Sequence, residues 1–204
     1  EKNEVSMTRH SLLAGRAALG WIVARALVSA AAAHDREDRG KLVISSAFAD
    51  ANPIDLGIKA ARSVIARAAI AAGDIDSVIT GNMAPGGFDQ FYVARHIGLY
   101  AGVPQEVPAL NAQRICGTGF ELFRQAGEQI ALGVANLALV VGTESMTRNP
   151  IAAFDHRQGF RLGAPLGFKD FMWEALTDPA AAVSMIQTAE NLATKYGITR
   201  EDVD

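Results

Sequence analysis

Cys116 lies in a sequence context in which a cysteine can act as a nucleophile. Cys116 follows a short extended stretch, Pro108 to Ala112, and opens the run Cys116-Gly117-Thr118-Gly119. At a helix start, unpaired backbone N–H groups and the positive end of the helix dipole stabilise a thiolate, which is the reactive form of cysteine. Gly117 and Gly119 leave space for a substrate carbonyl, and the amide of Cys116 can face the oxygen that becomes negative in acyl transfer. These features favour a catalytic cysteine over an inert buried one.

Two other motifs, a dinucleotide-binding loop and a hydrolase nucleophile elbow, share part of this pattern but are not matched by the sequence. A dinucleotide-binding G-x-G-x-x-G run would need a third glycine where Leu122 stands. A hydrolase nucleophile elbow would need glycine two residues before the nucleophile, where Arg114 stands.

The elements around Cys116 predict an α/β fold with parallel strands, because strand and helix signals alternate from residue 42 onward. A helix should begin at Pro53 behind the cap Asn52 and end at Gly73. The other expected elements are strands at 77–81, 108–112 and 137–141 and helices at 91–100, after Cys116, at 189–196 before Gly197, and after Thr199. A polar excursion from the sheet is expected at about 143–185, and long excursions in compact domains are often functional.

The first 41 residues differ from the rest. Leu19 to Ala33 is apolar, but Arg25 interrupts it and it is shorter than the ~20 residues a membrane span takes, so an Ala-rich helix is favoured over a secretory signal or a span. His34 to Lys41 is expected to be a charged connector. Residues 1–41 are thus an atypical leader to a domain at 42–204, and both chain ends look like cuts.

Composition excludes several classes of function. Lys and Arg total 19 against 22 Asp and Glu, which gives a net charge of −3 and argues against a nucleic-acid partner. A single cysteine excludes an internal disulfide, and the four histidines show no zinc-ligand spacing. We therefore expect a reducing, cytoplasmic setting and no metal.

Separated blocks of the sequence resemble thiolases, the acetyl-CoA acetyltransferase and 3-ketoacyl-CoA thiolase family. The segment NAQRICGTGF, followed by LALVVGTESMTRNP, is similar to the active-cysteine region of that family. DLGIKAARSVIARAAI and VITGNM upstream, and EALTDP and TAENLATKYGITRED downstream, occur in family order. The resemblance covers roughly residues 47–204.

This resemblance implies a layered α/β/α fold with a mixed sheet, present in part. It implies that Cys116 forms an acyl-enzyme in thiolysis of 3-ketoacyl-CoA or in Claisen condensation of acyl-CoA, with its amide in an oxyanion hole. Leu176 and Met185 align with residues of the acyl or pantetheine pocket, although plain apolar packing explains them equally well. Coenzyme A thioesters are then substrates, no separate cofactor is needed, and the complete protein is a homodimer or tetramer.

The sequence also departs from the family. The family's catalytic asparagine, its G-H-P histidine and its second cysteine lie in a C-terminal half, and none of the four histidines here precedes proline. The chain alone is therefore expected to turn over little or not at all. Residues 1–41 show neither the family's opening strand nor its R-T-P-F-G turn, and 41–46 (KLVISS) is the available strand-like piece. Ser184 stands where tetrameric biosynthetic members often have histidine, so short-chain specificity is not implied.

Two alternatives remain open at this point. A ketoacyl synthase also carries cysteine at a strand-to-helix turn, but small residues such as A-C-S-S-S are typical there, unlike Gly-Thr-Gly. A non-catalytic module that binds acyl-CoA or another subunit would also retain this fold.

Overall fold

The computed structural model describes residues 21–25, 48–154 and 156–204. The chain divides into two compact units, one ending at Arg148 and the other running from Asn149 to Asp204. Each unit is described by itself below.

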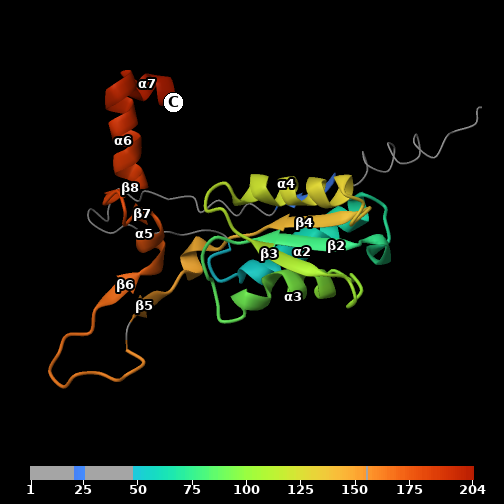
Figure 1. Cartoon of the computed structure of the whole chain (residues 1–204), viewed down its shortest axis with the longest axis horizontal. Coiled ribbons are helices and arrows are strands. Elements are labelled where there is room, and N and C mark those ends of the chain that lie inside the picture. Colours follow the sequence, from blue (N-terminus) through green and yellow to red (C-terminus); the bar gives the residue numbers. More distant parts are fainter. Residues whose placement is uncertain (1–20, 26–47, 155) are drawn as a thin grey trace, which may run out of the picture. The chain divides into compact units, whose positions relative to one another are not determined.

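A four-stranded sheet forms the centre of the first unit (Figure 1). Its strands are β1 (Trp21–Arg25), β2 (Ser77–Gly81), β3 (Ala109–Ala112) and β4 (Ala138–Gly142), in the order β1-β4-β2-β3. Every pairing among these described strands is parallel, so the mixed sheet expected from the resemblance is not seen in this part of the chain. Parallel strands need crossover connections, and helices supply them: α3 (Val93–Tyr100) lies between β2 and its neighbour β3, and α4 (Thr118–Ala131) leads from β3 to β4 on the other side of β2.

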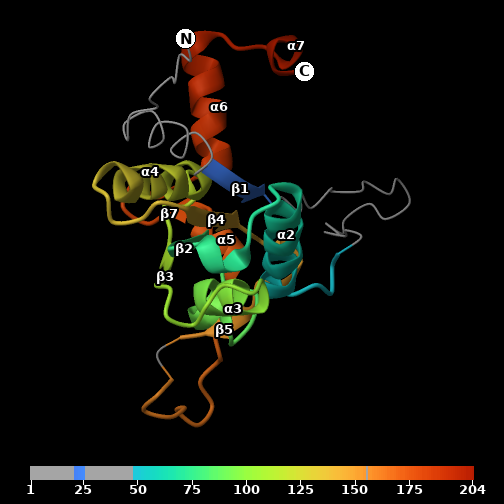
Figure 2. The same cartoon turned by 90° about the vertical axis from the view of Figure 1, so that its right-hand side faces the viewer.

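Alternate residues of the central strands pack on opposite faces of the sheet. Val78, Leu139 and Val141 belong to a core with α2 (Pro53–Arg67) and α3 (Val93–Tyr100). Ile79 and Val140 belong to a second core with α4 (Thr118–Ala131). Figures 1 and 2 show α4 on one face of the sheet and α2 and α3 on the other, as expected for strands buried on both sides. The prediction of an α/β fold with parallel strands is confirmed.

Helix α2 begins as predicted but ends early. The Asn52 side chain accepts a hydrogen bond from the Ile54 N–H at 2.8 Å, and Pro53 is the first helical residue. The helix ends at Arg67, not at Gly73, because Ala69 adopts a left-handed φ of 54° and the Ile70 N–H turns back to the Ile65 carbonyl. This is the closure of a Schellman motif, with alanine in the place usually taken by glycine. A 3-10 turn, Ala72–Asp74, follows.

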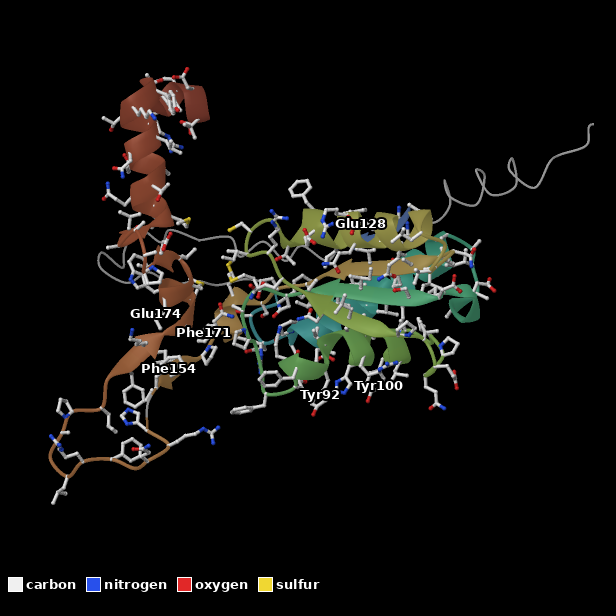
Figure 3. The ribbon with its side chains drawn as sticks, viewed as in Figure 1. Tyr92, Tyr100, Glu128, Phe154, Phe171 and Glu174 are labelled. Carbon is white, nitrogen blue, oxygen red and sulfur yellow. The ribbon has the colours of Figure 1, made fainter. Side chains whose placement is uncertain are left out.

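The other helices of this unit lie close to the predicted ranges. Helix α3 begins at Val93 rather than Phe91, because Gln90–Tyr92 forms a 3-10 turn. Tyr92 and Tyr100 extend from the outer side of α3, away from the sheet (Figure 3). Another 3-10 turn, Met146–Arg148, closes the unit.

The predicted helix across Leu19 to Ala33 is wrong for Trp21–Arg25. These five residues form β1 and pair in register with β4, Trp21 opposite Ala138 and Arg25 opposite Gly142. Pairing with a distant strand overrides the helix propensity of the alanines around it, and Ile22 and Val23 suit a strand. The rest of that range, the connector at 34–41 and the strand-like 41–46 lie outside the described residues.

Three hydroxyl groups hold residues 143–147 within the first unit, which ends at Arg148. Thr143 Oγ1 donates to the Pro53 carbonyl at 2.6 Å, Ser145 Oγ to Ala51 at 3.0 Å and Thr147 Oγ1 to Ala49 at 3.0 Å. These bonds tie the segment after β4 to the start of α2.

The second unit consists of two small strand pairs and three helices. The antiparallel pairs are β5 (Ile151–Ala153) with β6 (Phe168–Asp170) and β7 (Thr177–Asp178) with β8 (Val183–Ser184). The helices are α5 (Phe171–Ala175), α6 (Met185–Tyr196) and α7 (Arg200–Val203). As predicted, Gly197 ends α6, with a φ of 65°, and α7 begins after Thr199 in a capping box. None of the helices in the described ranges has the length and apolar character needed to span a bilayer.

Candidate active site

Three loops meet at the carboxyl edge of the sheet. They follow β2, β3 and β4, and parallel neighbouring strands place these ends side by side. Gln113 Nε2, after β3, donates to the Met83 carbonyl, after β2, at 2.8 Å. The Met83 N–H donates to Glu144 Oε2, after β4, at 2.8 Å. In open α/β sheets this edge is where ligands bind, and Cys116 lies in one of its loops.

The Glu144 carboxylate joins the loops that follow β2 and β4. It accepts hydrogen bonds from the Asn82 side chain at 3.0 Å and from the backbone N–H groups of Met83 and Ala84. Burial raises the pKa of Glu144, while these donors act in the opposite direction. The sequence analysis did not single out Glu144, whose partners lie some sixty positions away along the chain.

Cys116 is exposed and lies in a strained turn just before α4. Ile115 has a φ of 47°, a left-handed conformation that costs a β-branched residue about 1–3 kcal/mol. Thr118 spans this turn: its hydroxyl accepts from the Arg114 N–H at 2.8 Å and donates to the Ile115 carbonyl at 2.6 Å. Thr118 is buried, which holds the hydroxyl in place, and the sequence analysis did not assign it this role.

The two glycines after Cys116 lie where the helix begins. Gly117 is the N-cap of α4, and Gly119 is its second residue. A methyl group at Gly119 would meet no atom within 4 Å, whereas one at Gly117 would lie 3.3 Å from the Arg114 carbonyl oxygen. The predicted position of the cysteine at the entry to a helix is confirmed, and the space beside Gly119 is open within the described residues.

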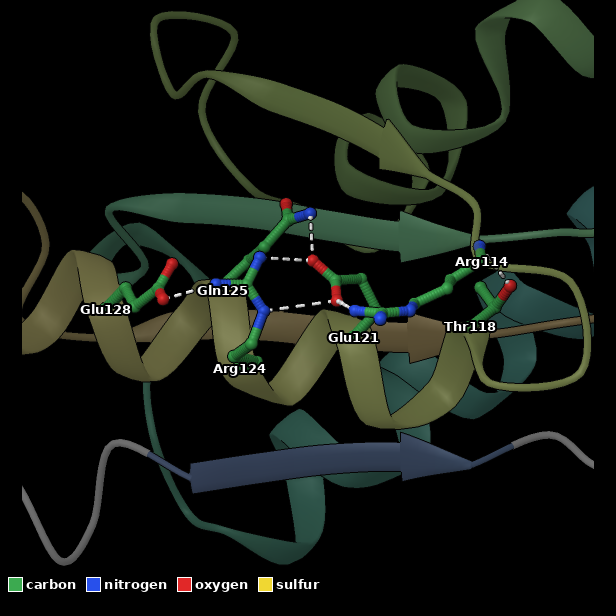
Figure 4. A network of polar contacts seen from close by, with 6 residues as sticks. All are labelled: Arg114, Thr118, Glu121, Arg124, Gln125 and Glu128. Carbon is green, nitrogen blue, oxygen red and sulfur yellow. Dashed lines mark hydrogen bonds and ion pairs between the residues drawn. The ribbon is translucent and has the colours of Figure 1, made fainter.

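A chain of charged side chains runs along α4 to the cysteine turn (Figure 4). Glu121 is buried, and its Oε2 accepts from Arg114 Nη1 at 3.0 Å and from Arg124 Nε at 3.1 Å. Its Oε1 accepts from Gln125 Nε2 at 3.0 Å and pairs with Arg124 Nη2. Arg124 in turn bonds Glu128. Hydrogen bonds from Arg124 above all, then from Gln125 and Arg114, lower the pKa of Glu121 to about 2.

The lowered pKa of Glu121 predicts a component of acid stability. A carboxyl group with a folded pKa of about 2 and an ordinary pKa of 4.5 stabilises the fold above about pH 4.5. That stabilisation is lost as pH falls from about 4.5 toward 2. Urea unfolding of the chain and of Glu121→Gln should therefore differ most above pH 4.5 and converge at lower pH. A difference that stays constant across this range would contradict the assignment.

Residues 32–204 match the family model "Thiolase, N-terminal domain". This chain belongs to the thiolase family. Among curated relatives, the mitochondrial 3-ketoacyl-CoA thiolase of Bos taurus is 38% identical over 155 residues, which are 76% of this chain and 39% of the relative. A probable acetyl-CoA acyltransferase of Staphylococcus aureus is 33% identical over 162 residues, 79% of this chain and 41% of the relative.

Solved thiolase structures agree in fold. Human mitochondrial 3-ketoacyl-CoA thiolase, crystallised in complex with CoA, superposes with a TM-score of 0.71 at 37% identity, covering 76% of this chain and 39% of that one. The Bacillus anthracis acetyl-CoA acetyltransferase gives a TM-score of 0.68 at 34% identity, with the same coverage. This chain thus spans about two fifths of the length of these thiolases.

The second unit of this thiolase chain brings the two predicted pocket residues together. Leu176 caps the end of α5, Met185 begins α6, and the Met185 N–H donates to the Leu176 carbonyl at 2.8 Å. Ser184, between them and next to Met185, caps α6 by accepting from the Gln187 N–H at 3.1 Å. Ser184 therefore serves as a helix cap in this chain.

Proposed function

We propose that this chain carries the nucleophile of a thiolase acyl transfer and that Cys116 is that nucleophile. The observation that supports the proposal is the exposed Cys116 at the carboxyl edge of a parallel sheet, one residue before the N-cap of α4. Family membership supports a coenzyme A thioester as the substrate class.

In the proposed first half-reaction, the Cys116 thiolate attacks the thioester carbonyl carbon of an acyl-CoA or the C3 carbonyl carbon of a 3-ketoacyl-CoA. A new carbon–sulfur bond forms on Cys116. In the acyl-CoA case the bond to the coenzyme A sulfur breaks and coenzyme A leaves as a thiolate; in the 3-ketoacyl case the bond between C2 and C3 breaks and acetyl-CoA leaves as its enolate, which then takes up a proton. In the second half-reaction the acyl carbon bonds to the sulfur of a coenzyme A thiolate or to C2 of the enolate of acetyl-CoA, and the bond to the Cys116 sulfur breaks, which releases the Cys116 thiolate. The amide of Cys116 is proposed to stabilise the oxyanion, and Leu176 and Met185 to line the acyl or pantetheine pocket.

Covalent labelling by acetyl-CoA tests this function. An acetyl group on Cys116, seen by intact mass and peptide mapping, supports the proposal. Coenzyme A that binds without leaving an adduct would instead support a non-catalytic acyl-CoA-binding module.

Gly119→Ala tests whether the substrate carbonyl approaches beside Gly119. The added methyl group meets no atom of the described residues within 4 Å, and alanine stabilises a helix by about 0.5–1 kcal/mol relative to glycine. The variant should therefore fold at least as stably but acquire acetyl groups about 10- to 100-fold more slowly, because the methyl displaces the thioester. Wild-type acetylation in a folded Gly119→Ala chain would show that the thioester approaches elsewhere.

A further inference from the structure

The side chain of Glu121 is linked to the turn that carries Cys116 by one hydrogen bond, which Arg114 donates. Glu121 lies in the first turns of α4 and its carboxylate reaches back to Arg114, two residues before Cys116. Arg114 is also the residue whose backbone N–H is held by the Thr118 hydroxyl. The backbone and the side chain of Arg114, the residue directly before the strained Ile115, are therefore both bound to α4.

The two partners of this contact differ in burial, and Glu121, the buried one, makes further hydrogen bonds. The Glu121 side chain is 9% exposed, while that of Arg114 is 71% exposed. An isolated ion pair with so exposed a partner would contribute little. Here, however, Arg124 bonds both carboxylate oxygens of Glu121 in a bidentate arrangement, and Gln125 donates a further hydrogen bond. A carboxylate fixed in this way presents Oε2 to Arg114 in one orientation.

We propose that Glu121, held by Arg124 and Gln125, is a positioning residue that sets the Cys116 turn through Arg114. This inference rests on the proposed function of Cys116 as the acyl acceptor. Glu121 touches neither the sulfur nor any substrate in this arrangement. Its effect is to keep residues 114–118 in the conformation that presents Cys116 at the helix entry.

The test compares Glu121→Gln with Glu128→Gln as a matched control. Glu128 lies on the same helix and bonds the same arginine, but it makes no bond to Arg114. Glu121→Gln should lower the maximal rate of Cys116 acetylation about tenfold without changing the acetyl-CoA concentration for half-maximal rate. Amide hydrogen exchange in residues 114–118 should accelerate about tenfold, whereas Glu128→Gln should stay within about twofold in both measurements.

Arg114→Gln provides a second variant that leaves the buried side chains in place. If Glu121 acts through Arg114, the double variant Arg114→Gln/Glu121→Gln will acetylate no more slowly than Arg114→Gln alone. Losses that add in the double variant would overturn the inference. Unchanged exchange at 114–118 in Glu121→Gln would also overturn it.

Hydrogen exchange separates this inference from the proposed function. If acetyl-CoA leaves no adduct on the wild-type chain, the acyl-transfer proposal fails. Faster exchange in Glu121→Gln, but not in Glu128→Gln, would then still support the positioning role. Equal exchange in all three chains would overturn it.

Discussion

Incubation with acetyl-CoA is expected to place one acetyl group on this chain and none on Cys116→Ser. Cys116 is the single cysteine of the sequence, and it is exposed, so a thioester adduct can form at one position alone. A serine hydroxyl is a much weaker nucleophile than a thiolate without a neighbouring base. The rate of labelling should fall on the order of 10³-fold or more. Intact mass over a time course gives both rates.

The chemistry of the adduct supplies the control. A thioester is cleaved by neutral hydroxylamine, whereas an acetylated lysine is not, so the wild-type adduct should disappear on this treatment. Iodoacetamide should block labelling of the wild-type chain by occupying the same sulfur. An adduct that survives in Cys116→Ser, or that resists hydroxylamine, would place the acetyl group on another residue and contradict the proposed nucleophile.

Gly81→Ala, at the end of β2, is expected to displace the start of α4, the helix that follows Cys116. An added methyl group at Gly81 would lie 2.3 Å from Thr118 Cγ2 and 2.9 Å from Leu122 Cδ1. Thr118 cannot rotate away without losing the two hydrogen bonds that hold the cysteine turn. The start of α4 must therefore shift, at a cost of about 1–3 kcal/mol in the free energy of unfolding. Acetylation of Cys116 should slow at least about tenfold as its turn moves.

Gly142→Ala is the matched control for this substitution. Gly142 pairs directly with Gly81 in the adjacent strand, and a methyl group there would meet no atom of the described part of the chain within 4 Å. Urea unfolding of Gly142→Ala should agree with wild type within about 0.5 kcal/mol, and its acetylation should be unchanged. If the two variants behave alike, the close packing of Gly81 on Thr118 is not what positions the cysteine.

Much of the fold could be predicted because its signals are local. Asn52 and Pro53 mark the start of α2, and Gly197 marks the end of α6, since caps act within a few residues of a helix end. The strand Ser77–Gly81 has the predicted bounds, because its β-prone residues lie between turn residues. The end of α2 was not predictable in this way, because an alanine takes the left-handed position that normally calls for glycine.

The sequence by itself determined the family and the candidate nucleophile: one cysteine, just before a predicted helix and followed by glycines, in blocks that resemble thiolases. The tertiary structure alone decided what holds that cysteine in place. Glu144 bonds Met83 between the loops that follow two adjacent strands, Trp21–Arg25 becomes a strand by pairing with β4, and the Glu121 side chain accepts a hydrogen bond from Arg114 in the loop before α4. Residue type and spacing determine caps and strand alternation, whereas strand pairing and the contacts between loops depend on which segments folding brings together.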